Sequence, residues 1–204
     1  VTKIAGTAFC DCTSLQNIVI PSSITEIEFR TFSGCTALTS VTIPDGVTTI
    51  GESAFEGCTG LTSVTISDSV TKISSAFASC SSLTSIFIPS SVCCIDSNAF
   101  IHCDSLNTIE VASDNVNYSS WDGVLFNKQR TILHCYPAGR SGKYVIPNGV
   151  IQIWPGAFWR CHGLTSVIIP DSVTTIGQSA FFDCSSLLDI TILNPNCTIG
   201  DEYP

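Results

Sequence analysis

Short apolar segments of the chain follow one pattern that returns every 23 residues. Copies begin at residues 1, 24, 47, 70, 92, 150 and 173, and the spacing shortens to 22 residues once, between 70 and 92. The frame is V-x-x-I-x-x-x-A-F-x-x-C-x-x-L-x-x-I-x-I-P, and its eight apolar positions are, in one copy, Val47, Ile50, Ala54, Phe55, Cys58, Leu61, Val64 and Ile66. A period of about 20 to 50 residues is typical of solenoids, so we expect each copy to form one turn of a coil.

Each copy contains two stretches in which apolar and polar residues alternate. Val41 and Ile43 flank Thr42, which predicts a short strand with one buried face. The V-T-x-I-G stretch has the same alternation and predicts a second, narrower strand. Between the two, A-F-x-x-C is too short for a stable helix and predicts a single 3₁₀ or α turn. A proline ends the first kind of strand in four copies, at Pro21, Pro44, Pro89 and Pro170.

Stacking of the copies is required, because no single copy can bury its own Phe, Leu, Ile and Val side chains. Removing each such side chain from water is worth about 1.5 to 3 kcal/mol. The pattern therefore predicts a mainly β solenoid of short parallel strands and turns, with little α-helix, in which residues 1–204 form a single domain. The last residues begin another V-T-x-I-G stretch, so we expect the chain to be a piece of a longer array.

The frame resembles the BspA-like, or treponeme-type, leucine-rich repeats, and the resemblance covers essentially the whole chain. The matching positions in two copies are Gly51, Ala54, Phe55, Cys58, Leu61 and Ile66, and Gly177, Ala180, Phe181, Cys184, Leu187 and Ile192. The chain departs from the frame at Ser67, Ala112 and Leu193, which replace the proline, and at Thr31, which replaces the alanine. The resemblance implies a right-handed leucine-rich-repeat solenoid in a non-enzymatic surface protein of bacteria or parasitic protists that adheres to host or microbial macromolecules.

Residues 115–149 interrupt the array, and the stretch from Asn117 to Lys128 is similar to an interruption common in that family. Two β-prone runs, GVLFN and TILHCY, are separated by Lys128-Gln129-Arg130, which predicts a β-hairpin. The stretch from Tyr144 to Pro147 then returns to the strand-and-proline pattern. We interpret the interruption as an elongated repeat that keeps its place in the stack and adds a hairpin.

The interruption differs from the rest of the chain in charge and in aromatic content. It contains one acid and four bases, whereas the remainder is strongly acidic, and all three tryptophans lie in it or in the copy that follows. In the simpler of two interpretations, the aromatic side chains only pack the hairpin onto the solenoid, because an isolated hairpin is marginally stable. In the other, aromatic and basic groups form a binding hot spot. The candidate binding residues are then Trp121, Arg130, Tyr136 and Arg140, with Phe87 and Glu110 on the neighbouring strands.

The composition of the chain narrows the classes of function. With 44% hydrophobic and 12% charged residues, the chain is too apolar to remain disordered. A net charge of -9 with only eight basic residues argues against a nucleic-acid partner. No apolar run approaches the roughly 18 residues needed to cross a bilayer, so we expect no membrane insertion in this segment.

Seven of the twelve cysteines occupy one position of the frame, and we predict that they form a buried ladder. Free cysteine behaves as a small apolar residue and is among the most often buried types. The seven are Cys12, Cys35, Cys58, Cys80, Cys103, Cys161 and Cys184. Disulfides between neighbouring turns stay open as an alternative, because stacking brings Cα atoms close enough. A metal site is not predicted, since His102 and His162 are far apart in sequence and no paired C-x₂₋₄-C element is present.

No catalytic residue is predicted. Ser69-Val70-Thr71-Lys72 matches the S-x-x-K pattern of serine acyl-enzymes, but it is an ordinary turn of the repeat, and the equivalent positions 46–49 and 172–175 lack the lysine. We predict an adhesion module of a cell-surface or secreted protein that needs no cofactor and binds a protein or other macromolecule, with host extracellular matrix among the candidates. An intracellular protein–protein interaction scaffold is the alternative, and an enzyme is a distant third.

Overall fold

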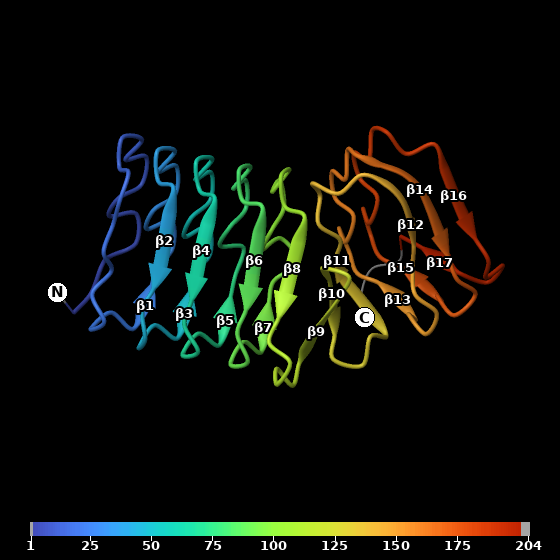
Figure 1. Cartoon of the computed structure of the whole chain (residues 1–204), viewed down its shortest axis with the longest axis horizontal. Coiled ribbons are helices and arrows are strands. Elements are labelled where there is room, and N and C mark those ends of the chain that lie inside the picture. Colours follow the sequence, from blue (N-terminus) through green and yellow to red (C-terminus); the bar gives the residue numbers. More distant parts are fainter. Residues whose placement is uncertain (1, 201–204) are drawn as a thin grey trace.

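In the computed structural model, which describes residues 2–200, the chain forms a solenoid of 17 short strands. The strands form two rows along the long axis of the molecule, and each regular turn of the coil adds one strand to each row (Figure 1). The described residues contain no helix, and therefore none long and apolar enough to cross a membrane. The prediction of a mainly β solenoid is confirmed.

The first row contains the strands predicted from the I-x-I pattern. They are β2 (Ser40–Ile43), β4 (Ser63–Ile66), β6 (Ser85–Ile88), β8 (Thr108–Val111), β12 (Gly142–Val145), β14 (Leu164–Ile169) and β16 (Asp189–Ile192). Neighbours are parallel, and repeat equivalents lie opposite each other, as Val41 does to Val64. In β2, β4 and β6 the side chains alternate between solvent and core. We call the outward-facing side chains of this row the strand face.

The second row contains the narrower strands predicted from the V-T-x-I-G pattern. They are β1 (Glu26–Ile27), β3 (Thr49–Ile50), β5 (Lys72–Ile73), β7 (Cys94–Ile95), β13 (Gln152–Ile153), β15 (Thr175–Ile176) and β17 (Thr198–Ile199). They too pair in parallel, with Ile27 opposite Ile50 and Ile50 opposite Ile73. The isoleucines of β1, β3 and β5 point into the core, so the predicted second strand and its buried position are both confirmed.

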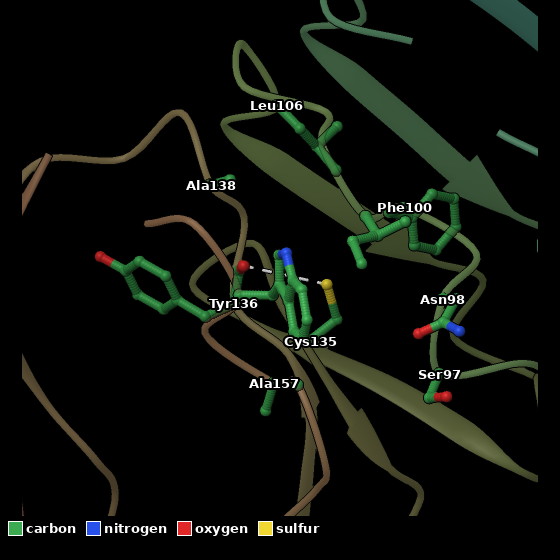
Figure 2. Close-up of a pocket in the computed structure, with 11 residues that line it drawn as sticks. Ser97, Asn98, Phe100, Leu106, Cys135, Tyr136, Ala138 and Ala157 are labelled. Carbon is green, nitrogen blue, oxygen red and sulfur yellow. Dashed lines mark hydrogen bonds between the residues drawn. The ribbon is translucent and has the colours of Figure 1, made fainter. Parts of the chain in front are cut away.

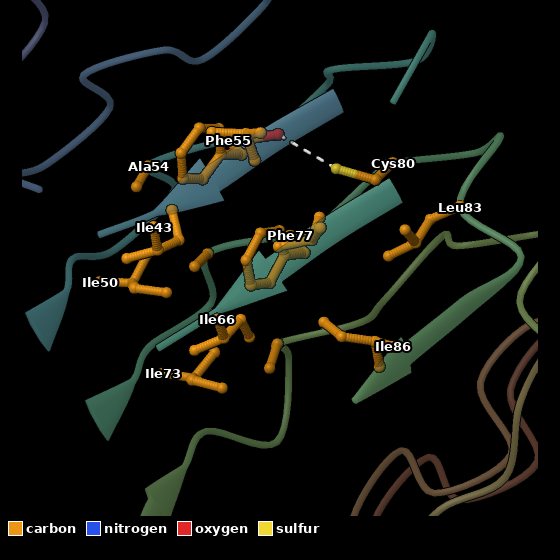
Figure 3. Packing of buried hydrophobic residues seen from close by; sticks show 14 of the residues in the cluster. Ile43, Ile50, Ala54, Phe55, Ile66, Ile73, Phe77, Cys80, Leu83 and Ile86 are labelled. Atoms are coloured by element: carbon orange, nitrogen blue, oxygen red, sulfur yellow. Dashed lines mark hydrogen bonds between the residues drawn. The ribbon is translucent and has the colours of Figure 1, made fainter. Parts of the chain in front are cut away.

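Each turn before the interruption contributes one phenylalanine to a continuous aromatic stack along the first part of the core. Adjacent ring centroids lie 5.3 to 6.3 Å apart from Phe32 to Phe100. Figure 3 shows Phe55 and Phe77 in this stack, with isoleucines from both strand rows around them. Each ring covers its neighbour, so the turns bury together what none could bury alone.

Five of the seven cysteines predicted to form a buried ladder are buried, whereas Cys12 is exposed and Cys184 is half-buried. The buried ladder also makes hydrogen bonds. The thiol of Cys58 donates to the carbonyl of Phe32 at 3.1 Å, and the thiol of Cys80 donates to the carbonyl of Phe55 at 3.2 Å (Figure 3). Burial raises the pKa of the Cys58 thiol to about 12, so the thiol keeps the proton that it donates. All twelve cysteines are free in the structure. Each of these two thiols fills the core and satisfies a carbonyl of the preceding turn.

The A-F-x-x-C segment forms hydrogen-bonded β-turns rather than a turn of helix. The N–H of Ala54 bonds to the carbonyl of Gly51, and the N–H of Cys58 bonds to the carbonyl of Phe55. Ser53 has a φ of 56°, which prevents a continuous helical path. The N–H of Phe55 instead reaches the carbonyl of Ala76 in the next turn at 2.8 Å, so bonds between turns also hold this edge of the coil.

The interruption folds into three antiparallel strands, β9 (Tyr118–Trp121), β10 (Val124–Asn127) and β11 (Ile132–Cys135). The pairing of β10 with β11 confirms the predicted hairpin. Strand β9 was not predicted, and it joins β10 through the tight turn at Asp122-Gly123, where both residues have positive φ. β11 also pairs in parallel with β13, so the interruption keeps its place in the second row.

The interruption divides the solenoid into two hydrophobic cores, the second of which includes Tyr136. In the first row, β8 pairs with β6 and β12 pairs with β14, while the tip of the β9–β10 hairpin lies beside β8. There the N–H of Ile109 bonds to the carbonyl of Gly123. The strands after the interruption are tilted relative to those before it (Figure 1). We call the region between the turn that carries Phe100 and the turn that carries Phe158 the junction.

Candidate functional site

An open cleft crosses the strand face at the junction, beside the tip of the β9–β10 hairpin. Its lining is mainly polar and carries two carboxylates and one guanidinium. We call it the junction cleft, and its residues are Asn107, Thr108, Glu110, Ser120, Asp122, Gly123 and Arg140. The cleft exists because the tip of the β9–β10 hairpin takes the place of a regular strand in the first row. On this side, the hairpin is the strand neighbour of β8.

The charged groups of the junction cleft are held in place before any partner arrives. The guanidinium of Arg140 donates to Oδ2 of Asp122 at 2.7 Å and to the carbonyl of the same residue. It also lies 5.3 Å from the ring centroid of Tyr136. On β8, Glu110 accepts a hydrogen bond from Oγ1 of Thr108 at 2.9 Å. The cleft therefore presents fixed charges of both signs, and it brings together the predicted residues Glu110 and Arg140.

Exposed apolar side chains flank the junction cleft on the strand face. Before the junction, the outward positions are mostly hydroxyl side chains, which are Ser40, Thr42, Ser63, Thr65 and Ser85. Phe87 is 53% exposed and lies opposite Glu110 in the β6–β8 register. On the other side, Val145 is 61% exposed and lies opposite Ile168. Val145 was not predicted, although its place after Tyr144 in the strand-and-proline pattern marks it as an outward position.

The interruption carries an exposed pair of candidate binding residues. Trp121 ends β9 and is 51% exposed, and the guanidinium carbon of Arg130 lies 4.5 Å from its ring centroid. Such an arrangement is a cation–π contact, in which the ring quadrupole attracts the positive charge. The structure thus brings Trp121 and Arg130 together, and Trp121 directly precedes Asp122 of the junction cleft.

Tyr136 lies in the core and not on the surface. It is 3% exposed and occupies the phenylalanine position of the frame, with its ring centroid 4.9 Å from that of Phe158 and 4.7 Å from that of Tyr144. Burial raises the pKa of its hydroxyl. A side chain this buried cannot make large contacts with a partner, so we leave Tyr136 out of the proposed surface. For this residue, the packing interpretation of the interruption applies.

The structure brings together two histidines that lie far apart in the sequence. His102 and His162 both contact the guanidinium of Arg160, which occupies the space between them. Within residues 2–200, no three side chains of His, Cys, Asp and Glu are grouped so that they could hold a metal ion.

A solenoid with an open strand face is the architecture of repeat proteins that bind large partners across several turns. The family model described as a BspA type leucine rich repeat region matches residues 2–129 and 139–203 in six copies. The chain belongs to this family. The unmatched residues 130–138 contain β11, where the interruption departs most from the frame.

Solved structures of bacterial leucine-rich repeat proteins share this fold. A leucine rich cell surface protein from Faecalibacterium prausnitzii A2-165 is 40% identical with a TM-score of 0.79, over 91% of this chain and 50% of that one. The pneumococcal vaccine antigen PcpA is 28% identical with a TM-score of 0.76, over 84% of this chain and 44% of that one. A leucine rich repeat protein from T. pallidum is 27% identical with a TM-score of 0.59, over 92% and 72%. The chain therefore spans half or less of the length of the first two proteins. No curated protein sequence matches it significantly.

Proposed function

We propose that this chain is a macromolecule-binding module of a cell-surface or secreted protein, and that it binds a protein ligand through the strand face around the junction cleft. The family supports a role in binding, and two of the similar structures are a cell surface protein and a vaccine antigen. One observation carries the location: exposed apolar side chains on the strand face flank a cleft with fixed charges. We assign the chain no catalytic residue and no cofactor.

The composition of this surface suits a protein interface. Interface hot spots are enriched in Trp, Tyr and Arg and are surrounded by contacts that exclude water. Phe87 and Val145 supply apolar area on either side of the cleft, whereas the hydroxyl side chains of the earlier turns bury little. Arg140 is already ordered by Asp122, so binding loses less side-chain entropy there. The partner that fits best offers apolar side chains for the margins and a charged group for the cleft.

Two substitutions in the interruption test whether the proposed binding surface extends from the junction cleft to the exposed pair Trp121 and Arg130. Trp121→Ala and Arg130→Ala should each weaken binding by about 1 to 2 kcal/mol, because each removes one member of an exposed cation–π pair. The probe is a protein captured by the chain from an array of extracellular-matrix, host-surface and microbial-surface proteins, with affinity measured by calorimetry. The thermal midpoint of both variants should stay near that of the wild type, since both side chains lie on the surface.

Thr42→Ala is the matched control, because Thr42 is exposed on the same face but lies on β2, away from the junction. Its affinity should equal that of the wild type. The opposite pattern would count against the proposal: a lower thermal midpoint for the two hairpin variants, with unchanged binding by the fraction that remains folded. Failure of the chain to bind any protein on the array would count against an adhesion role.

A further inference from the structure

A groove opens in the second row of strands, where the interruption breaks the row. One sheet of this row ends at β7, and the next sheet continues it from β11. The groove at this break has a volume of about 500 Å³, within the range of about 300 to 1,000 Å³ that is usual for ligand sites. We call it the second-row groove, and it shares no lining residue with the junction cleft. Its lining includes Asp96, Ser97, Asn98, Tyr118, His134 and Trp154.

Three successive turns carry a charged or aromatic side chain at one frame position that is small in most other turns. This position follows the inward-facing residue of each second-row strand, and regular turns place Gly51, Ser74 and Gly177 there. Its occupants around the break are Asp96, His134 and Trp154. Equivalent positions stack from turn to turn, so these three side chains form one row along the second-row groove.

Aromatic rings form one wall of the second-row groove. The ring centroid of His134 lies 4.6 Å from that of Trp154 and 5.4 Å from that of Tyr118. Burial lowers the pKa of His134 to about 4, so its ring is uncharged at pH 7. Turns are stacked about 4.8 Å apart, which is close to the length of one pyranose unit in a glycan chain. A row of rings at this spacing can contact the C–H faces of successive sugar units, because the negative face of a ring attracts polarised C–H groups.

The loop after β7 supplies polar groups to the second-row groove. Within the part of the chain that the structure describes, the side chains of Asp96, Ser97 and Asn98 make no hydrogen bond or ion pair. The hydroxyl of Tyr118 accepts a hydrogen bond from the N–H of Ile95 at 3.0 Å and keeps its own proton to donate. A carboxylate accepts, whereas an amide and a hydroxyl both donate and accept. This mixture suits sugar hydroxyls, which also do both.

The open edge of β7 adds a backbone acceptor to the groove. The N–H groups of Cys94 and Asp96 bond to the preceding turn, so the N–H and the carbonyl of Ile95 point the other way, toward the groove. In the preceding turn the equivalent carbonyl, that of Ile73, accepts from the N–H of Asp96. The carbonyl of Ile95 accepts no hydrogen bond from any of residues 2–200. The break therefore leaves it available to a ligand that has donors.

A small cavity adjoins the second-row groove on its inner side. Ser97 and Asn98 line both spaces, and Figure 2 shows their side chains on one side of the cavity, facing Cys135. The volume of this cavity is about 20 Å³, which is enough for about one water molecule. A sugar unit cannot enter it, so the open groove is the part of the break that can hold a ligand.

We propose that the second-row groove binds an uncharged glycan, with sugar faces against the rings of Tyr118, His134 and Trp154 and sugar hydroxyls bonded to the loop of residues 96–98. Asp96 and the net charge of -9 disfavour glycans that carry carboxylates or sulfates. An extended peptide that adds a strand to the sheet fits less well, because β7 offers an edge of only two residues. The inference does not rest on the proposed protein-binding function.

Titration of the whole chain at pH 7 with neutral tetrasaccharides of glucose, galactose, mannose and N-acetylglucosamine tests the proposal. Calorimetry and tryptophan fluorescence measure the affinity. We expect at least one of the four to bind with a dissociation constant below about 1 mM. Tetralysine is the cationic comparison, because Asp96 would also attract ammonium groups, and it should bind more weakly. No binding of any tetrasaccharide at millimolar concentration, or tighter binding of tetralysine, would overturn the proposal.

Trp154→Ala tests whether the second-row groove is the binding site. The substitution removes the largest ring of the aromatic wall and should weaken binding of the tetrasaccharide by about tenfold or more. Alanine suits this frame position, since Ala5 occupies it in the first turn. Trp121→Ala is the matched control, because it removes the same atoms from an exposed tryptophan outside the groove, and it should keep the wild-type affinity. Equal affinities of Trp154→Ala and Trp121→Ala would count against the groove.

Asp96→Ala keeps the proposal testable if Trp154→Ala fails to fold. The carboxylate makes no hydrogen bond or ion pair with any of residues 2–200, so the thermal midpoint should stay near that of the wild type. Glycan affinity should fall about fivefold or more, because a charged acceptor for sugar hydroxyls is lost. Asp68→Ala, in an exposed turn outside the groove, should leave the affinity unchanged. Wild-type affinity in Asp96→Ala would overturn the proposal.

Discussion

Phe55→Ala is expected to lower the free energy of unfolding by about 3 to 5 kcal/mol. The side chain is fully buried, and its ring centroid lies 5.3 Å from that of Phe32 and 5.6 Å from that of Phe77. Hydrogen bonds between turns fix the spacing of the rings, so the neighbours cannot close the cavity that the substitution leaves. Urea unfolding followed by circular dichroism measures the change.

Phe87→Ala is the matched control for this prediction. It removes the same atoms from a side chain that is 53% exposed on the strand face. Its effect on the free energy of unfolding should stay within about 1 kcal/mol, while it should weaken ligand binding. If both variants unfold at the same urea concentration, the division of phenylalanines between the core and the strand face is wrong.

Asn115→Ala is expected to destabilise the chain by an amount on the order of 4 kcal/mol. The side chain is fully buried where the chain leaves β8 for the interruption. Its Nδ2 donates to the carbonyls of Pro89 and Val92, and its Oδ1 accepts from the N–H groups of Asn117 and Tyr118, all at 2.8 to 2.9 Å. Alanine would leave these four backbone groups without their partner.

Asn117→Ala provides the comparison in the same segment, because its side chain is exposed and its backbone N–H can still bond to Asn115. We expect a change of less than about 0.5 kcal/mol in urea unfolding. Asn115→Asp should remain destabilising, since a carboxylate oxygen would face two carbonyl oxygens. Equal unfolding midpoints for Asn115→Ala and Asn117→Ala would show that the buried amide does not hold the interruption in place.

The repeat frame predicts the fold position by position, because every turn must bury the same apolar positions against its neighbours. Val64 and Ile66 point inward for the same reason as Val41 and Ile43, and Cys58 is buried because its equivalents stack along the core. Seven copies of one pattern remove the ambiguity that a single short apolar run would carry. The hairpin of the interruption was predictable from local sequence for a similar reason, since two β-prone runs flank a short turn.

The contacts at the junction were not predictable, because they join different copies without a fixed spacing. Arg160 reaches His102 across a whole irregular turn. The burial of Tyr136 follows from the register of β11 with β13, which the frame does not specify inside the interruption. Strand β9 is short and half polar, and only the Asp122-Gly123 turn signals it. Charged and aromatic residues in an interruption can either pack against the solenoid or bind a partner, and only the structure distinguishes these two roles.

The binding surface around the junction cleft is the central claim, and a hydrogen-exchange footprint tests it most directly. Exchange of the whole wild-type chain would be compared at pH 7 with and without the protein captured from the array. We expect slower exchange in β6, β8, β9, β12 and residues 139–141, with β2, β4 and the second row of strands unchanged. Protection centred on the second row, or spread equally over all turns, would contradict the claim.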